Sequence, residues 1–195
     1  MRWRRDVRHF LMAPVDPALV RRLIQTAMLA PSVGFSQPWR WVLVEGEEKR
    51  RAVWDNFAAA NERAAQEYEA ERAAQYRDLK LAGLKDAPVH LAVFADVAAE
   101  TGHGLGRRTM PETAVWSVVM AVYALWLAAR AEGLGLGGVS ILEPAPLNRV
   151  LDVPEEWTFV SYLCLGWPSR DRDSPLLEEA GWESRLGDEA LVLER

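Results

Sequence analysis

One long segment of the chain carries no charge, and it limits the fold more than any other feature of the sequence. Residues Thr113 to Ala129 read TAVWSVVMAVYALWLAA. As an α-helix this segment reaches about 26 Å, which is short of the ~30 Å hydrocarbon core of a membrane. A helix that is apolar on every side is expected inside a protein core or a subunit interface. We predict the interface, and no membrane span.

Composition limits the remaining classes of protein. The chain has 195 residues, half of them hydrophobic and about a quarter charged, which predicts one globular domain over residues 1–195. The net charge of −5 argues against nucleic-acid binding. A single cysteine, Cys164, excludes an intramolecular disulfide and fits a reducing compartment, so we expect a cytoplasmic protein. The three histidines lack the spacing of metal ligands, and we predict no metal site.

Apolar periodicity and turn residues predict alternating helices and strands. A helix should begin at Asp16-Pro17 and end before Pro31, because an acidic N-cap followed by proline favours a helix start. The other expected helices cover 47–57, 56–81, 113–132 and 144–151, and the expected strands cover 39–44, 88–95, 138–142 and 158–165. This pattern indicates an α+β or α/β fold with a mixed sheet flanked by helices.

The first group of residues suited to chemistry lies at the start of the chain. Arg4, Arg5 and Arg8 offer three guanidinium groups within five residues, and their fork-shaped donors suit a phosphate. Asp6 lies inside this group. Its carboxylate is either a simple ion-pair partner or a group held ready for proton transfer. A solvated basic terminus is the alternative for the whole group.

The second group is a loop between a helix end and a strand start. Residues 30–39 read APSVGFSQPW, in which Gly34 permits backbone conformations closed to other residues. Pro31, Ser32 and Gln37 lie on either side of it, and the last two supply polar side chains. From the residues alone this is only a polar loop.

The third group is rich in glycine. Gly133, Gly135 and Gly138 satisfy G-x-G-x-x-G, but they follow a helix and precede a strand, which is the reverse of the dinucleotide-binding arrangement. Backbone without side chains would still let a flat ring approach its N–H groups closely, and Ser140 lies at that point. The alternative is a helix C-cap followed by a turn.

Together and in this order, the three groups resemble the nitroreductase superfamily. In that superfamily an RRSxRxF-like start binds the flavin phosphate, an APSxxNxQPW-like loop contacts the flavin, and a glycine-rich turn places backbone against the isoalloxazine ring. The resemblance implies an α+β fold in a domain-swapped homodimer, with FMN bound at the subunit interface. The apolar segment agrees with this, since the superfamily buries its central helix between subunits.

Within the superfamily, the match is closer to one branch, the BluB-type 5,6-dimethylbenzimidazole synthases. The matching segments are RRDVRHF, APSVGFSQPW, YRDLKLAGLKDAP, TMPE, LWLAARAEGLGLGGVSIL, YLCLGWP and GWESR, which span about residues 4–185. Phe35 replaces the loop asparagine, as it does in that branch. This resemblance implies that reduced FMN is the substrate and O₂ the co-substrate, and that the flavin is fragmented to the lower ligand of vitamin B12.

The same resemblance assigns roles to residues. Asp6 matches the aspartate that acts in proton transfer, and Ser140 matches the serine placed near the ring nitrogens. The arginines at positions 4, 5 and 8 would hold the phosphate, and residues 58–86 would form a lid over the site. A separate NAD(P)H flavin reductase would supply reduced FMN. The remaining residues expected to contact the flavin are Pro31, Ser32, Gly34, Gln37, Gly138, Val139, Ile141 and Arg185.

Two other interpretations stay open at this point. The first is an enzyme that keeps FMN as a bound cofactor, either a nitroreductase or a reductive dehalogenase of the iodotyrosine deiodinase type. The second is a flavin-binding carrier without enzyme activity. Asp6 disfavours the carrier, because a pure binding site gains nothing from an acid beside a phosphate.

Overall fold

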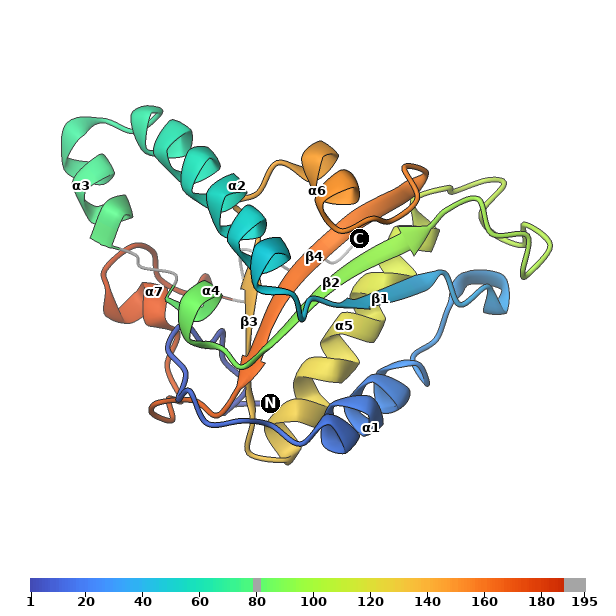
Figure 1. Cartoon of the computed structure of the whole chain (residues 1–195), viewed down its shortest axis with the longest axis horizontal. Helices are drawn as coiled ribbons and strands as arrows, with labels where there is room; N and C mark the ends of the chain where they lie inside the picture. The colour runs from blue at the N-terminus through green and yellow to red at the C-terminus, as the bar shows by residue number, and fades with distance from the viewer. Residues whose placement is uncertain (79–81, 188–195) are drawn as a thin grey trace.

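The computed structural model describes residues 1–78 and 82–187, with a four-stranded sheet at the centre (Figure 1). The strands are β1 (Trp39–Leu43), β2 (Val89–Asp96), β3 (Gly135–Val139) and β4 (Trp157–Gly166), in the order β1-β2-β4-β3. All three neighbouring pairs are antiparallel. The α+β class is confirmed, but the predicted mixed sheet is wrong for these strands, because alternation of helices and strands does not fix strand direction. Within the described ranges, the parallel pairing consists of one isolated bridge, between Asp6 and Leu136.

Helices cover both faces of the sheet (Figure 1). On one face lie α1 (Pro17–Ala27) and α5 (Thr113–Ala131), and on the other lie α2 (Glu47–Gln66) and α6 (Pro144–Val150). The short elements are η1 (Val33–Phe35), α3 (Ala70–Asp78), α4 (Gly83–Asp86) and α7 (Leu176–Glu179). The predicted start of the first helix is confirmed, since the Asp16 carboxylate accepts a hydrogen bond of 2.8 Å from the backbone N–H of Ala18.

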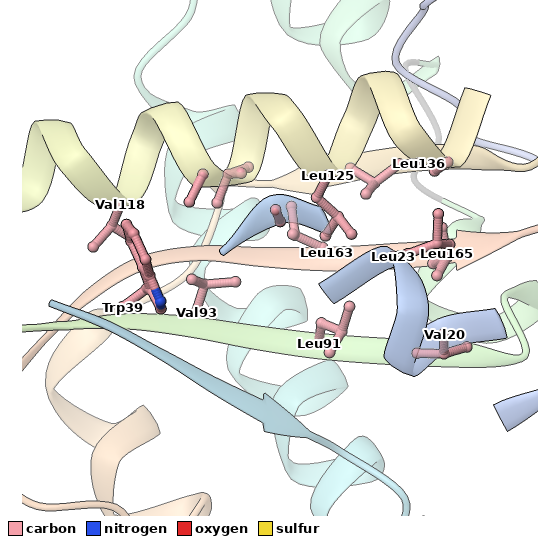
Figure 2. Packing of buried hydrophobic residues seen from close by; sticks show 14 of the residues in the cluster. Val20, Leu23, Trp39, Leu91, Val93, Val118, Leu125, Leu136, Leu163 and Leu165 are labelled. Atoms are coloured by element: carbon pink, nitrogen blue, oxygen red, sulfur yellow. The ribbon is translucent and has the colours of Figure 1, made fainter. Parts of the chain in front are cut away.

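Alternating side chains of each strand separate the core into two layers. On β2, Leu91 and Val93 face α1 and α5, whereas Ala92 and Phe94 face α2 and α6. Figure 2 shows the first layer, in which Leu91 and Val93 meet apolar residues of α1, α5 and β4. Full burial of each such leucine or valine contributes about 1.5–3 kcal/mol, so this layer fixes α5 on the sheet.

The second layer contains buried groups that could be mistaken for a site. His90 Nδ1 lies 2.9 Å from the Tyr162 hydroxyl, and His90 Nε2 lies 3.2 Å from the Ala87 carbonyl oxygen. Burial lowers the pKa of His90 to about 4, so the imidazole is neutral and structural. Burial also raises the pKa of the Cys164 thiol to about 12, which fits the small buried hydrophobe expected from the sequence.

Three predicted boundaries are wrong. The helix expected over residues 56–81 is interrupted at residues 67–69, between α2 and α3, and residues 79–81 of it lie outside the described ranges. The helix that begins at Glu47 does not end near Phe57 but continues to Gln66, because Val53, Phe57 and Ala60 lie on one buried face. The third strand begins at Gly135 and ends at Val139, whereas the sequence predicted residues 138–142. Glycine has low strand propensity, so the pattern hid a strand that pairs with β4 over residues 135–139.

The charge-free segment forms α5, as predicted. By length and composition alone this helix could cross a membrane, yet one side packs in the core through Val118, Ala121 and Leu125. Its other side exposes four large apolar residues at helical spacing, which are Trp116, Val119, Met120 and Tyr123. Apolar patches of this kind mark interaction surfaces in soluble proteins.

Candidate functional site

The start of the chain lies along the free edge of β3. The backbone N–H of Val7 donates to the Leu136 carbonyl at 3.1 Å. The Asp6 Oδ1 atom accepts a hydrogen bond of 2.9 Å from the Gly138 N–H. On the side of α5, the Trp126 indole N–H donates to the Arg5 carbonyl at 3.2 Å. The arginine group and the glycine-rich strand, distant in sequence, are therefore side by side.

Two glycines of β3 make this approach possible. A Cβ atom on Gly137 would overlap the carbonyl oxygen of Val7, and one on Gly135 would lie 2.7 Å from the Val7 side chain. The sequence suggested that the glycines make room for a flat ring, but these two make room for the chain itself. The Gly138 N–H, one of the N–H groups of the strand that a flat ring was expected to approach, donates to Asp6 Oδ1.

Each of the three N-terminal arginines has a different support. The Arg4 guanidinium lies over the Trp126 ring, 5.1 Å from its centroid. Arg5 donates through Nε to the Asp173 carbonyl at 3.0 Å. Arg8 Nε lies 3.4 Å from Asp6 Oδ2. The side chains are thus fixed by stacking and hydrogen bonds rather than dispersed in solvent as at an ordinary basic terminus.

These arginines line a cavity of about 120 Å³. Three further arginines line it from the end of α5 and from the segment after β4, namely Arg130, Arg170 and Arg172. The wall contains two carboxylates, Asp6 and Asp171. Arg130 pairs with Asp171 at 2.6 Å, and Arg170 and Arg172 both pair with Glu179. Guanidinium groups still outnumber carboxylates, and such fork-shaped cationic donors suit a phosphate group. The donor set therefore fits the phosphate end of a flavin nucleotide.

Asp6 is the titratable group that connects this cavity to the glycine strand. Its side chain is 37% exposed, so solvent or a ligand can reach it. Burial raises the pKa of this carboxyl, and the Gly138 hydrogen bond and the charges of Arg8 and Arg4 only partly oppose the rise. A carboxyl with a raised pKa, fixed through one oxygen, is suited to exchange a proton.

The residues after Gly138 extend the surface that Asp6 and the glycine strand form beside the arginine-lined cavity. A second, smaller cavity of about 10 Å³ lies beside Asp6 and is lined by Gly137, Gly138, Val139 and Cys164, with α4 opposite. Val139 is buried, Ser140 is exposed and Ile141 is half-buried. Ser140 therefore lies immediately beyond the strand with its side chain accessible.

The predicted flavin-contacting loop is not part of this constellation. Residues 31–37 precede β1, and β1 and β3 are opposite edges of the sheet. Neighbouring strands lie about 4.8 Å apart, so roughly 14 Å separates the two edges.

The loop and Asp6 are also offset along the strands. Trp39 is level with Ala95, which pairs with Thr158 on β4. Gly138, in contrast, pairs with Leu163 on β4. The offset is about five residues, or roughly 16 Å. One subunit therefore does not bring the loop to Asp6.

Sequence reasoning missed several residues of the cavity. Arg130, Arg170 and Arg172 lie in stretches where charges recur without a pattern, and Trp126 looked like one more apolar residue of α5. Only proximity to the N-terminal arginines identifies them. Arg185, which was predicted to bind the flavin, is exposed after α7, and within residues 1–78 and 82–187 no polar contact ties it to the cavity.

Comparison with known proteins places the chain among its relatives. The nitroreductase family model matches residues 1–167. The 5,6-dimethylbenzimidazole synthase of Rhodospirillum rubrum is 54% identical over 183 residues, which are 94% of this chain and 87% of that protein. The enzyme of the same name from Rhodobacter capsulatus is 48% identical over 186 residues, 95% of this chain and 90% of that protein.

Solved structures show the same fold. The oxidized iodotyrosine deiodinase bound to FMN and 3-iodo-L-tyrosine superposes with a TM-score of 0.73 at 22% identity, covering 87% of this chain and 88% of that one. The identity is low, so this likeness concerns the fold alone. With a matching family model over most of its length and relatives about half identical, the chain belongs to the nitroreductase family.

Proposed function

We propose that this chain is a 5,6-dimethylbenzimidazole synthase, which consumes reduced FMN and O₂ and releases the lower ligand of vitamin B12. The observation that carries the proposal is the 54% identity to a synthase of that name over 94% of the chain. The deiodinase of the same fold is 22% identical, far below that value. Asp6, held at the arginine-lined cavity, supplies the acid that the reaction needs.

The arginine-lined cavity binds the phosphate of FMN in this proposal. Arg4, Arg5 and Arg8 approach it from the N-terminal segment, and their fixed forks favour a dianion over an uncharged hydroxyl. The isoalloxazine ring supplies the chemistry with O₂. Pro31, Ser32, Gly34 and Gln37 contact the ring, together with the wall formed by Gly138, Val139 and Ile141.

Asp6 and Ser140 act on the bound flavin. The Gly138 N–H holds Asp6 Oδ1, and the weaker contact with Arg8 leaves Asp6 Oδ2 able to take or give a proton. Ser140, which is accessible beyond β3, hydrogen-bonds the ring nitrogens in this proposal. Arg185 is assigned to flavin binding through the matching GWESR segment.

The active unit is a homodimer. Trp116, Val119, Met120 and Tyr123 form an exposed apolar stripe that a second subunit would bury. The separation of the loop 31–37 from Asp6 supports the same conclusion, because a partner can place its loop against this subunit's arginine cavity. Exchange of elements between the subunits, expected from the resemblance, is part of the proposal.

Residues 58–86 form the lid. They comprise the end of α2, then α3 and α4, while residues 79–81 lie outside the described ranges. The lid helix α3 packs on the chain after α7: the Arg72 guanidinium lies 4.7 Å from the centroid of the Trp182 ring, and Gln75 donates to the Ala180 carbonyl. Closure over the site would exclude water during the reaction.

Electrons come from a separate NAD(P)H-dependent flavin reductase, and the protein works in the cytoplasm. Cys164, the single cysteine, is buried and free, as suits a reducing compartment.

Product identification tests the function directly. FMN is reduced without oxygen in the presence of the purified protein, a pulse of O₂ is added, and the products are identified by chromatography and mass spectrometry. We expect dimethylbenzimidazole to form in proportion to enzyme, and none in a sample without protein. Recovery of intact, reoxidised FMN alone would contradict the proposal and leave a flavin-dependent reductase, dehalogenase or carrier.

A further inference from the structure

The loop at residues 31–37 has an unusual backbone. Gly34, Phe35 and Gln37 all have positive φ angles, of 56°, 56° and 47°. Glycine adopts this left-handed region easily, but phenylalanine and glutamine rarely do. Such strain persists only where the surrounding structure enforces it, and it concentrates at functional sites. Two hydrogen bonds hold the ends of the turn: the Gln37 N–H donates to Ser32 Oγ at 3.1 Å within the loop, and the Val33 N–H donates to Ser117 Oγ of α5 at 3.0 Å. Neither bond involves Gly34 or Phe35, so the middle of the loop depends on the segment packed against it.

The segment at residues 97–112 packs directly on the loop. A Cβ atom on Gly34 would lie 2.8 Å from the Leu105 carbonyl oxygen, and one on Gly102 would overlap the carbonyl oxygen of Gly34. The two backbones are thus in contact, with no side chain between them. Because residues 97–112 form no helix or strand, this segment needs its own support to act as a rigid wall.

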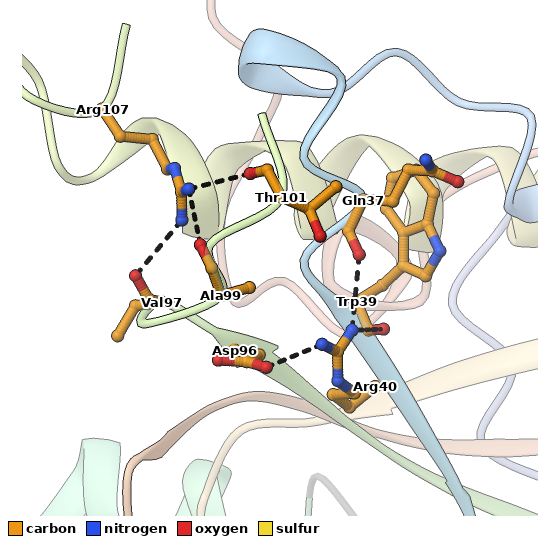
Figure 3. A network of polar contacts seen from close by, with 8 residues as sticks. All are labelled: Gln37, Trp39, Arg40, Asp96, Val97, Ala99, Thr101 and Arg107. Atoms are coloured by element: carbon orange, nitrogen blue, oxygen red, sulfur yellow. Dashed lines mark hydrogen bonds and ion pairs between the residues drawn. The ribbon is translucent and has the colours of Figure 1, made fainter. Parts of the chain in front are cut away.

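Arg107 provides that support. Its Nη2 atom donates to the carbonyls of Ala99 and Thr101 at 2.6 and 2.9 Å, and its Nη1 atom donates to the Val97 carbonyl at 3.3 Å (Figure 3). One guanidinium therefore gathers three carbonyls of the segment that contacts Gly34. The planar guanidinium reaches the three carbonyls from two separate nitrogen atoms, whereas a lysine ammonium would have to reach them from one, so lysine reproduces the arrangement only in part.

A second arginine holds the loop from the side of the sheet. Arg40 Nη2 pairs with Asp96 at 2.6 Å, and Arg40 Nη1 donates to the carbonyls of Trp39 and Gln37 at 3.0 and 3.4 Å. Figure 3 shows both guanidinium groups, with Asp96 and Val97 connecting their two regions along the chain. Arg40 fixes the end of the loop, whereas Arg107 fixes the wall against its middle.

We propose that Arg107 is a positioning residue for flavin binding: it holds the wall that keeps the loop 31–37 in the conformation that contacts the ring. The inference rests on the proposed function, which assigns that loop to the flavin. Arg107 acts only through the backbone of residues 97–105, so its loss weakens FMN binding and leaves Asp6 and its proton transfer intact.

The test compares Arg107→Gln and Arg107→Lys with Arg108→Gln. Arg108 is the neighbouring exposed arginine, so its substitution makes the same change of charge in the same segment. We measure amide hydrogen exchange over residues 31–37 without ligand, the Kd for oxidised FMN, and KM and kcat for reduced FMN. In Arg107→Gln we expect exchange, Kd and KM each to rise about tenfold, the effect of losing one or two net hydrogen bonds. We expect kcat to stay within about twofold, Arg107→Lys to be intermediate, and Arg108→Gln to match the wild type.

The outcomes separate this inference from the proposed function. A folded Arg107→Gln protein with wild-type exchange, Kd and KM overturns the role of Arg107, and so does a fall in kcat without a change in KM. If Arg107→Gln does not fold, Arg107→Lys decides by the same measurements. A wild-type protein that forms no dimethylbenzimidazole overturns the proposed function, while hydrogen exchange and FMN binding still test Arg107.

Discussion

At the β3 edge of the sheet, Asp6 and Val7 bond directly to the backbone of a strand, whereas at the β1 edge the loop 31–37 keeps a strained conformation against an irregular segment. The first region needs glycines that let two backbones meet. The second needs two arginines that gather carbonyl oxygens. Both regions were expected to contact one flavin, yet they lie at opposite edges of the sheet.

The two edges of the sheet therefore differ in role: the β3 edge has groups that can take part in the reaction, and the β1 edge has groups that can position the flavin. The β3 edge carries the carboxyl with the raised pKa and the arginine-lined cavity. The β1 edge offers polar side chains and backbone instead. Substitutions at the β3 edge should therefore reduce turnover, and those at the β1 edge should reduce affinity. Each subunit would hold two half-sites and complete both only with its partner.

The largest effect is expected from Asp6→Asn. Asparagine keeps an oxygen for the Gly138 N–H but cannot exchange a proton, so kcat should fall by about 10²–10⁴ while the Kd for FMN changes less than about threefold. Stopped-flow product formation and FMN fluorescence titration measure the two quantities. Asp152→Asn, at an exposed position, is the control and should behave as the wild type. Equal losses of binding and turnover would make Asp6 structural.

Gly137→Ala should have the next largest effect, because it separates the N-terminal segment from β3. The added methyl group would overlap the Val7 carbonyl oxygen, which is backbone and cannot turn away. We expect a loss of about 1–3 kcal/mol in the free energy of unfolding, as for overpacked cores, and weaker FMN binding. Denaturant unfolding measures the former.

Gly46→Ala is the matched control for this substitution. A Cβ at Gly46 meets no atom within 4 Å, and the expected cost is that of a less favourable N-cap, under about 1 kcal/mol. If the two alanine variants were equally stable, the close approach of Val7 to β3 would not be a requirement of the fold.

Mixed dimers test whether the two regions meet across subunits. Asp6→Asn inactivates the β3 half-site, and Gly34→Val should inactivate the loop, since its Cβ would lie 2.8 Å from the Leu105 carbonyl at a positive φ. Each homodimer should be inactive. A refolded equimolar mixture should regain about a quarter of wild-type activity, because half of the dimers are mixed and each has one intact site. No recovery would place both half-sites of each flavin in one chain.

The sequence predicted the fold wherever burial decided local structure. The apolar helix, the Asp16 start of α1 and three of the four strands follow from periodicity and from capping. The position of β3 could not be predicted in this way, because its glycines have no side chains to show a pattern. They are in a strand because β4 pairs with them on one side and residues 6 and 7 meet them on the other.

The sequence could predict which segments contribute to the candidate site, but not how those segments contact one another. Clustered arginines and the glycine-rich run identified both sides of the cavity, and the resemblance selected Asp6. Neither could show that Gly135 and Gly137 accommodate Val7, or that Arg130 and Arg172 complete the cavity wall. Those facts depend on contacts between distant parts of the chain, for which local sequence carries no signal.

The smallest expected effect is that of Asp6→Asn on the free energy of unfolding, which measures how much the Asp6 carboxyl destabilises the fold. Burial raises the pKa of Asp6 above its ordinary value of 3.8, so the folded protein binds that proton more tightly than the unfolded chain does. Stability is then highest when Asp6 is protonated, and it falls as the pH rises from about 3.8 through the folded-state pKa. Asp6→Asn cannot ionise and should be more stable than the wild type at pH 7, by less than about 1 kcal/mol because the side chain is partly exposed. Urea unfolding of both proteins between pH 4 and 7, with Asp152→Asn beside them, should show this advantage shrinking towards pH 4. An advantage that grows as the pH falls would mean that the ion pair with Arg8 outweighs burial and that ionised Asp6 stabilises the fold. An advantage independent of pH would mean that the two effects cancel and that folding leaves the pKa of Asp6 unchanged.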